Sequence, residues 1–326
     1  MKLTFTDIAA ITCGAEYLSE EAEGILFHRF TAEEERCALA NMSDIYNIQV
    51  PSAADIRLAF RTDARRLKIE YACRYNGNKV PNCGRIDVLV DGNLRAHLGR
   101  DAENFDAEDS LTLPGGDKLV ELYLPYTKHF YLRELALDGG FTPAKRPLTM
   151  INYGDSITHG YDAEYPSKTY TAFLARLCGA DNCNKGVGGG RFDPVMLEPE
   201  EPMRPDLVTV AFGTNDWCHK TRDELSADCR EYFRRLAAKF PAAKIFAITP
   251  IWRADAEADM PFGAPAWEIG DVIAEQTKDF DNVFVIPGWE LVGHDPGLFN
   301  DKVLHPNDIG FADYGPRLYE AMKKYL

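Results

Sequence analysis

Residues 148–160, LTMINYGDSITHG, place an apolar run directly before a serine that lies between an aspartate and an isoleucine. Farther along, residues 167–179 repeat apolar side chains on one helical face and end in a glycine, which predicts a helix. The serine, Ser156, therefore stands at a predicted strand-to-helix turn. It is either a catalytic nucleophile or an ordinary turn serine that caps a helix, and this segment alone does not decide between the two roles.

Strand and helix patterns keep alternating from this segment to residue 326. Further apolar strands are expected at 205–213, 243–252 and 282–288, and further helices at 222–240, 266–280 and 308–325. Alternation of this kind predicts a parallel sheet covered by helices on both faces. We therefore expect an α/β domain with a doubly wound, flavodoxin-like sheet.

The chain before residue 140 follows a different pattern. Residues 55–75, 84–99 and 117–139 alternate apolar and polar side chains with a period of two, and Asp91-Gly92 is a tight-turn signal. Short strands joined by regular turns predict an antiparallel β-sandwich, here of jelly-roll type.

A proline-containing segment separates the two patterns. Residues 141–150, FTPAKRPLTM, carry two prolines, which stiffen the chain and cannot donate to a strand ladder. We therefore predict a sandwich domain over residues 1–143 and an α/β domain over residues 147–326.

The composition excludes several classes of partner. A net charge of -15 argues against general binding to nucleic acid or anionic membranes, because phosphates repel such a surface. The first residues carry acidic side chains where a signal peptide needs an apolar core, and the sequence contains no apolar stretch long enough for a transmembrane helix. The eight cysteines form no C-x-x-C pair, which favours free thiols. We expect a cytoplasmic protein that binds neither nucleic acid nor membrane, and its oligomeric state stays open.

Four short blocks follow predicted strands of the α/β part. Ligands of such sheets bind outside the carboxyl ends of the strands, so these blocks are candidates for a site. They are GDSIT (154–158), NKGVGGGR (184–191), GTND (213–216) and HPND (305–308).

Each block also has an ordinary interpretation. The glycine-rich block lacks the last glycine of a dinucleotide fingerprint, since residue 191 is arginine, and it lacks the Gly-Lys-Ser/Thr end of a nucleotide-triphosphate loop. GTND alone is compatible with a simple turn, and HPND with a helix start whose His305 is solvated.

Together the four blocks supply what acyl transfer needs. Ser156 offers a hydroxyl, and His305 offers an imidazole that takes a proton near neutral pH. The backbone N–H groups of Ser156 and Gly189 and the side-chain amide of Asn215 are candidate donors for a developing oxyanion. Because these groups occur together, we interpret Ser156 as a nucleophile and not as an ordinary turn residue.

In this order of serine, glycine, asparagine and histidine, residues 147–326 resemble the GDSL-type hydrolases, also called the SGNH superfamily. The resemblance implies Ser156 as nucleophile, His305 as general base, and Ser156, Gly189 and Asn215 as the oxyanion hole. One feature departs from the family. The triad aspartate usually lies three residues before the histidine, where this chain has Lys302, and Asp301 stands one residue earlier. Either Asp301 or a backbone carbonyl orients His305, and we favour Asp301.

The whole arrangement is similar to the two-domain carbohydrate esterases, in which a β-sandwich precedes a GDSL-type domain. That resemblance implies a serine esterase of the carboxylic ester hydrolase class, which removes a small acyl group, best an acetyl group, from a sugar through an acyl-enzyme on Ser156. The expected partner is a small-molecule or oligosaccharide ester. Two alternatives stay open: a lipid or thioester hydrolase, and a carbohydrate-binding protein whose catalytic half is idle.

We expect four further residues near the substrate: Asp155, Tyr165, Trp217 and Trp252. The tryptophans follow predicted strand ends, where their rings are able to stack on sugars, although tryptophans more often pack in cores. We expect neither a cofactor nor a metal, because Asp216, Cys218 and His219 have no supporting ligand set.

Overall fold

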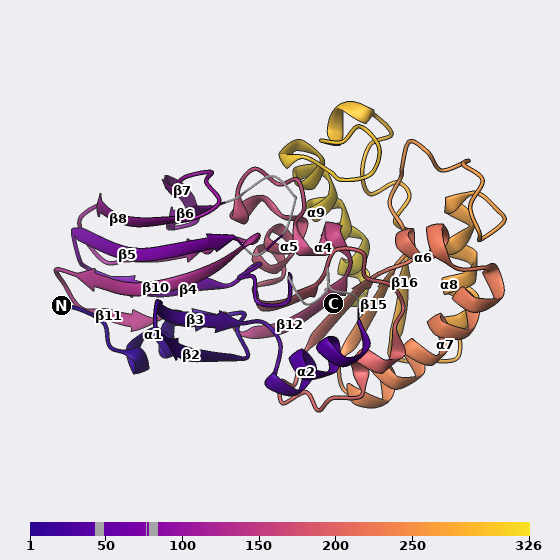
Figure 1. The fold of residues 1–326 in the computed structure, drawn as a ribbon, viewed down its shortest axis with the longest axis horizontal. Helices are drawn as coiled ribbons and strands as arrows, with labels where there is room; N and C mark the ends of the chain where they lie inside the picture. Colours follow the sequence, from indigo (N-terminus) through magenta and orange to yellow (C-terminus); the bar gives the residue numbers. More distant parts are fainter. Residues whose placement is uncertain (43–48, 76, 78–83) are drawn as a thin grey trace.

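A computed structural model describes residues 1–42, 49–75, 77 and 84–326 of the chain. In Figure 1, antiparallel strands occupy one end of the molecule, and a parallel sheet wrapped by helices occupies the other end. The predicted fold class, a β-sandwich followed by a doubly wound α/β domain, is confirmed. The last sandwich strand, β11, ends at Pro143, and the first strand of the parallel sheet, β12, begins at Leu148. The residue limits of the two domains themselves stay a prediction.

The first part of the chain forms two antiparallel sheets. One has the order β1-β4-β9-β6-β7, with β11 beside β4, and the other has the order β2-β3-β10-β5-β8. The strands of the first sheet are β1 (Thr12–Cys13), β4 (Arg57–Thr62), β6 (Arg85–Val90), β7 (Asn93–Gly99), β9 (Lys118–Tyr123) and β11 (Phe141–Pro143). Those of the second are β2 (Tyr17–Glu21), β3 (Gly24–His28), β5 (Arg66–Tyr75), β8 (Phe105–Thr112) and β10 (Lys128–Leu137). Their alternating apolar side chains, such as Phe60, Leu67 and Ile69, form one buried core.

Two helices interrupt the sandwich, and the period-two pattern did not predict them. They are α1 (Phe5–Ile11) and α2 (Ala32–Asn41). Each begins with a capping box, in which a threonine accepts from the backbone and an acidic side chain three residues later accepts in return. Local capping therefore starts these helices where apolar periodicity is weak.

The second part forms a parallel sheet with the order β13-β12-β14-β15-β16, the strand order of flavodoxin-like folds. Its strands are β12 (Leu148–Gly154), β13 (Ala180–Gly186), β14 (Leu207–Ala211), β15 (Lys244–Ile248) and β16 (Val283–Ile286). Helices α5 (Tyr170–Cys178) and α9 (Asp308–Met322) pack on one face. Helices α7 (Arg222–Lys239) and α8 (Ile269–Thr277) pack on the other. Shorter helical turns are α4 (Ser156–His159), α6 (Thr214–His219), η1 (Pro166–Lys168), η2 (Pro194–Leu197), η3 (Ala266–Glu268), η4 (Pro296–Leu298) and η5 (Lys323–Tyr325).

Strand β13 has the polar sequence ADNCNKG, although it is buried along most of its length. Its polar side chains find partners in the sandwich part: Asp55 accepts hydrogen bonds from Asn182 and Asn184 at 2.9 and 2.8 Å. Arg29, which follows β3, donates to the carbonyl oxygens of Asn184 and Gly186. The sandwich part thus satisfies an edge strand that an isolated α/β domain leaves exposed.

Among the described residues, no helix is both long and apolar enough to cross a membrane. Seven cysteines of the described ranges carry free thiols, whereas Cys83 lies outside them.

Candidate active site

Ser156 stands where β12 ends and the short helix α4 begins. Asp155 caps this helix by accepting a hydrogen bond from the Ile157 N–H at 2.9 Å. A Cβ on Gly154 would lie 2.0 Å from the Thr158 hydroxyl oxygen, so only glycine permits this tight turn. The Ser156 hydroxyl oxygen lies 2.8 Å from Nε2 of His305, which comes from the loop before α9.

The second nitrogen of His305 faces a carboxylate. Nδ1 lies 2.7 Å from Oδ2 of Asp301, so hydroxyl, imidazole and carboxylate form one continuous chain. The other oxygen, Oδ1, accepts from the backbone N–H groups of Val303, Leu304 and His305 at 2.9, 2.8 and 3.1 Å. Lys302, the extra residue of this loop, adopts a left-handed φ of 64°.

The environment of His305 favours its protonated form. Burial lowers its pKa, but the hydrogen bond and charge of Asp301, together with the charges of Asp162 and Asp155, outweigh burial and raise the pKa above its ordinary value. Burial raises the pKa of Asp301, yet hydrogen bonds from His305 and from backbone N–H groups lower it well below its usual range. Asp301 is therefore ionised at neutral pH, and an imidazolium at His305 is stabilised.

A glycine turn over residues 187–190 forms the neighbouring edge of the site. It is closed by a hydrogen bond from the Gly190 N–H to Val187 O at 2.9 Å, and the Val187 N–H donates to Gly154 O at 3.0 Å. Gly189, at the tip, has a left-handed φ of 78° and is exposed. The Asn215 side-chain amide donates one hydrogen to Gly190 O at 3.1 Å, and its second hydrogen makes no hydrogen bond to the residues that the structure describes. The structure therefore places all four motif residues around one point of the sheet edge.

Two residues expected to contact substrate do not present a surface to it. Trp217 is wholly buried, and its indole N–H donates to Ala264 O at 2.8 Å. Asp155 is also buried, and its carboxylate caps α4. The predictions of substrate contact for Trp217 and Asp155 were therefore wrong, because the first residue packs the core and the second holds the nucleophile turn.

Tyr165 lies against the sandwich part. Its ring stacks on His97 with centroids 3.8 Å apart, and its hydroxyl accepts from Arg85 at 3.2 Å. Substrate contact by Tyr165 stays a prediction, and its observed neighbours are at the junction of the two parts.

Trp252 follows β15 and is half-buried beside the histidine loop. Its ring stacks on exposed His294 with centroids 5.5 Å apart and touches Phe299 at 5.3 Å. His294 in turn contacts Trp289, whose ring meets the exposed Trp267. Substrate contact by Trp252 stays a prediction, now joined to a row of aromatic rings at this edge of the sheet.

Two further residues lie at the site, although no sequence motif pointed to them. The ring of Tyr161 lies 6.1 Å from that of His305, and its hydroxyl lies 2.9 Å from the position of a Cβ on Gly188. Gln49, from the sandwich part, accepts a hydrogen bond from the Gly188 N–H. Neither residue belongs to a motif block, and only the folded chain brings them to the glycine turn.

One group of possible metal ligands occurs among the described residues. Ligand atoms of Asp162, Asp301 and His305 lie within 4.8 Å of one another. Two of the three already bind each other, and His305 also faces Ser156. Asp216, considered earlier with Cys218 and His219, is instead paired with Lys220 at 2.9 Å.

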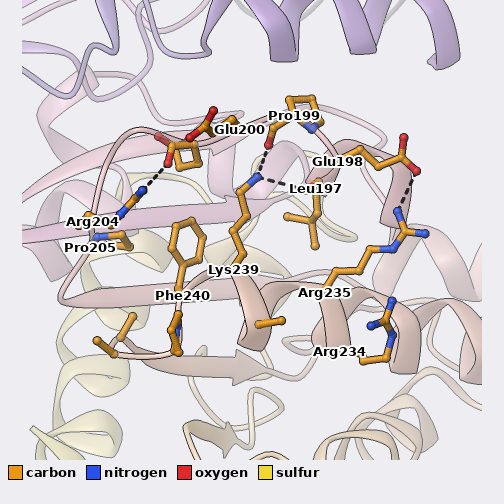
Figure 2. Close-up of a pocket in the computed structure, with 15 residues that line it drawn as sticks. Leu197, Glu198, Pro199, Glu200, Arg204, Pro205, Arg234, Arg235, Lys239 and Phe240 are labelled. Carbon is orange, nitrogen blue, oxygen red and sulfur yellow. Dashed lines mark hydrogen bonds and ion pairs between the residues drawn. The ribbon is translucent and has the colours of Figure 1, made fainter.

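A separate groove lies at the opposite edge of the sheet, where β14 and β15 begin. The groove has a volume of about 830 Å³. Figure 2 shows it between the segment 197–205 and the end of α7. Its cations are already engaged: Lys239 donates to Leu197 O at 3.1 Å, and Arg235 pairs with Glu198 at 2.9 Å. The groove shares no residue with the Ser156 site.

Comparison with known families identifies the second part of the chain. Residues 153–312 match the model of the GDSL-like Lipase/Acylhydrolase family. The C-terminal domain belongs to this GDSL-like acylhydrolase family. Residues 11–133 match a second model, the N-terminal domain of SsfX3. The expected identity, an SGNH-type ester hydrolase with an added N-terminal β-sandwich, is thereby confirmed.

Several solved structures share the fold over both parts. The salicylyl-acyltransferase SsfX3 from a tetracycline biosynthetic pathway superposes with a TM-score of 0.82 at 24% identity, covering 100% of this chain and 97% of its own. A putative GDSL-like lipase from Bacteroides ovatus gives 0.78 at 21% identity, covering 96% and 94%. A family two carbohydrate esterase from Clostridium thermocellum, in complex with cellohexaose, gives 0.66 at 14% identity, covering 84% and 93%. Among curated proteins no sequence matches the chain.

Proposed function

We propose that this ester hydrolase removes a small acyl group, best an acetyl group, from a carbohydrate through an acyl-enzyme on Ser156. The observation that carries the proposal is the unbroken chain from the Ser156 hydroxyl through His305 to Asp301, with contacts of 2.8 and 2.7 Å. A hydroxyl that faces an oriented imidazole is the arrangement in which serine becomes a nucleophile.

In the acylation step, the Ser156 oxygen attacks the ester carbonyl carbon while Nε2 of His305 takes the hydroxyl proton. The carbonyl oxygen becomes an oxyanion, which the N–H groups of Ser156 and Gly189 and the free amide hydrogen of Asn215 stabilise. Asp301 holds the proton on Nδ1 and stabilises the imidazolium that forms. The tetrahedral intermediate then collapses, His305 protonates the leaving sugar oxygen, and the acyl group remains on Ser156.

In the deacylation step, a water molecule replaces the leaving alcohol. His305, again neutral, takes a proton from this water as its oxygen attacks the acyl carbon. The same donors hold the second oxyanion, and its collapse releases the acid and returns the proton to Ser156. Neither step requires a cofactor.

Two features support a carbohydrate as the alcohol part. Trp252, His294 and Trp289 offer partly exposed rings beside the histidine loop, and flat aromatic faces stack well on pyranose rings. A family two carbohydrate esterase in complex with cellohexaose also shares the fold over 84% of this chain. We further propose a cytoplasmic location, which the free thiols of the described cysteines favour.

A second candidate is acyl transfer to an alcohol acceptor in place of water. The near-complete overlap with a salicylyl-acyltransferase and the match to its N-terminal domain favour it. The chemistry up to the acyl-enzyme is the same, so product analysis distinguishes the two: hydrolysis releases free acid at all acceptor concentrations, whereas transfer diverts the acyl group to added alcohol.

Labelling with a fluorophosphonate tests the proposal, because the reagent requires an activated serine. We expect wild type to be labelled and Ser156→Ala to remain unlabelled. Absence of labelling in folded wild type would favour a carbohydrate-binding protein with an idle catalytic half. A preference for acyl chains of about eight carbons or more over acetyl would instead favour a lipid hydrolase, and a preference for thioesters would favour a thioesterase.

A further inference from the structure

The turn that presents the Gly189 N–H consists largely of glycine, a residue with wide conformational freedom. Gly188, Gly189 and Gly190 follow one another, and glycine loses more conformational freedom on ordering than any other residue. A donor aimed at an oxyanion must nevertheless be held in place before the reaction. External contacts therefore decide whether this turn is ready for catalysis.

Among the described residues, three hydrogen bonds hold the turn, and one of them comes from outside the α/β part. Val187 is tied to Gly154 beside the nucleophile, and Gly190 is tied to Asn215. Between these ties, the Gly188 N–H donates to the side-chain oxygen of Gln49. Gln49 lies between α2 and β4 of the sandwich part and is only 3% exposed.

The hydrogen bond from Gly188 to Gln49 leaves no room for a side chain at residue 188. A Cβ at residue 188 would lie 2.8 Å from the Gln49 side-chain oxygen and 2.9 Å from the Tyr161 hydroxyl. Gln49 and the Tyr161 hydroxyl therefore both lie against Gly188, and the Tyr161 ring lies 6.1 Å from that of His305. The contact fixes the peptide plane directly before the Gly188–Gly189 peptide, which carries the donor.

The backbone of Gln49 is itself held by hydrogen bonds. Its backbone oxygen accepts from Arg29 at 3.0 Å and from the Ser52 hydroxyl at 2.7 Å. The Arg29 guanidinium is fully buried and donates on its other side to Gly186 O at 3.0 Å. The Ser52 hydroxyl lies 3.1 Å from Nε2 of His159, in the helix that begins at Ser156. The segment 49–52 thus touches both the nucleophile helix and the glycine turn.

We propose that Gln49 is a positioning residue of the oxyanion hole, through which the sandwich part aligns the Gly189 N–H with Ser156. The proposal rests on the proposed function, since it assigns Gly189 to the oxyanion hole. It gives the sandwich part a role in the chemical step that is separate from binding a sugar. Gln49 makes this contribution as a hydrogen-bond acceptor, through Gly188.

Gln49→Leu tests this role because leucine keeps much of the volume and removes the acceptor. Complete removal of an oxyanion donor lowers kcat by about 10²- to 10³-fold, so a misaligned donor is expected to lower the acylation rate by about tenfold or more. The rate is measured per active serine, after titration of active sites, with acetyl and butyryl esters of one leaving group. We expect the same factor for both esters, because the oxyanion is common to them.

Gln49→Glu keeps an acceptor at the same position, and its acylation rate is expected to lie closer to wild type than that of Gln49→Leu. Arg146→Met is the matched control: it removes bonds from Arg146 to Glu121 and to Ala180 O, between the same two parts but at the other end of β13. This control is expected to lower Tm without changing the rate per active serine.

Three results would overturn the proposal: a Gln49→Leu rate within twofold of wild type, a loss confined to one ester, or equal losses in Gln49→Leu and Gln49→Glu. Failure of the proposed function itself is distinguishable, because wild type would then contain no titratable serine.

Discussion

Asp301→Asn is the substitution that examines the unusual loop of this site most closely. In the native loop, three backbone N–H groups point at Oδ1 of Asp301, and Oδ2 faces Nδ1 of His305 at 2.7 Å. An asparagine must place its carbonyl oxygen toward the three N–H donors, so its NH₂ group faces Nδ1. Nδ1 then has to accept, and the ring proton moves to Nε2, where it blocks acceptance of the Ser156 proton.

The expected loss of kcat follows from this tautomer, in which Nε2 carries the ring proton. The same change in a Ser-His-Asp triad lowers kcat by about 10⁴-fold, equivalent to about 5 kcal/mol of transition-state stabilisation. Loss of the carboxylate also removes the main hydrogen bond and charge that raise the pKa of His305. Wild-type activity should rise as pH increases through this raised pKa, since only neutral His305 accepts a proton, and in the variant that rise should move to lower pH.

The assay is a pH profile of kcat/KM for a short acyl ester, measured on wild type, Asp301→Asn and a matched control. Asp162→Asn provides the control, because its carboxylate lies within 4.8 Å of the same pair and is replaced by the same amide. For Asp162→Asn we expect a small shift of the acid limb of the pH profile and a plateau of kcat/KM within about threefold of wild type. A plateau in Asp301→Asn within about tenfold of wild type would refute the assignment and favour a backbone carbonyl as the group that orients His305.

Three further predictions concern the oxyanion donor Asn215, the aromatic ring of Trp252 and the buried ion pair of Lys185. Asn215→Ala should lower kcat by about 10²- to 10³-fold with little change in KM, and an unchanged kcat would remove Asn215 from the oxyanion hole. Trp252→Ala should raise KM for a glycan acetyl ester several-fold and leave a small aryl acetate unaffected; equal effects on both would argue against ring stacking. Lys185→Met should reduce the free energy of unfolding by about 3–5 kcal/mol, because Lys185 is buried against Glu34 at 2.7 Å, and exposed Lys278→Met should leave the free energy of unfolding nearly unchanged in the same denaturation assay.

Much of the fold was predictable because its signals are local. The apolar strands of the second part and the period-two strands of the first depend on which residues must be buried, and both patterns are continuous in the sequence. Ser156, Gly189, Asn215 and His305 were proposed by the same logic, since each follows a predicted strand and ligands of such sheets bind outside the carboxyl ends of the strands.

Features that depend on contact between the two parts were not predictable. Strand β13 is polar because Asp55 and Arg29 satisfy it from the sandwich, and no periodicity within residues 180–186 carries that information. Trp217 follows a motif block, yet the fold turns its ring into the core. The contact of 2.7 Å between Asp301 and His305 spans a loop in which Lys302 adopts a left-handed φ, a non-glycine conformation that spacing alone does not predict.

The central claim is that Ser156 carries the acyl group during turnover, and rapid-quench mass spectrometry tests it most directly. Wild type is mixed with an activated acetyl ester, stopped within the first turnover and digested. The account predicts a burst of leaving group equal to the titrated active sites and one added acetyl group on the peptide that contains Ser156. Acetate release with no burst and no acetyl group on that peptide would contradict it.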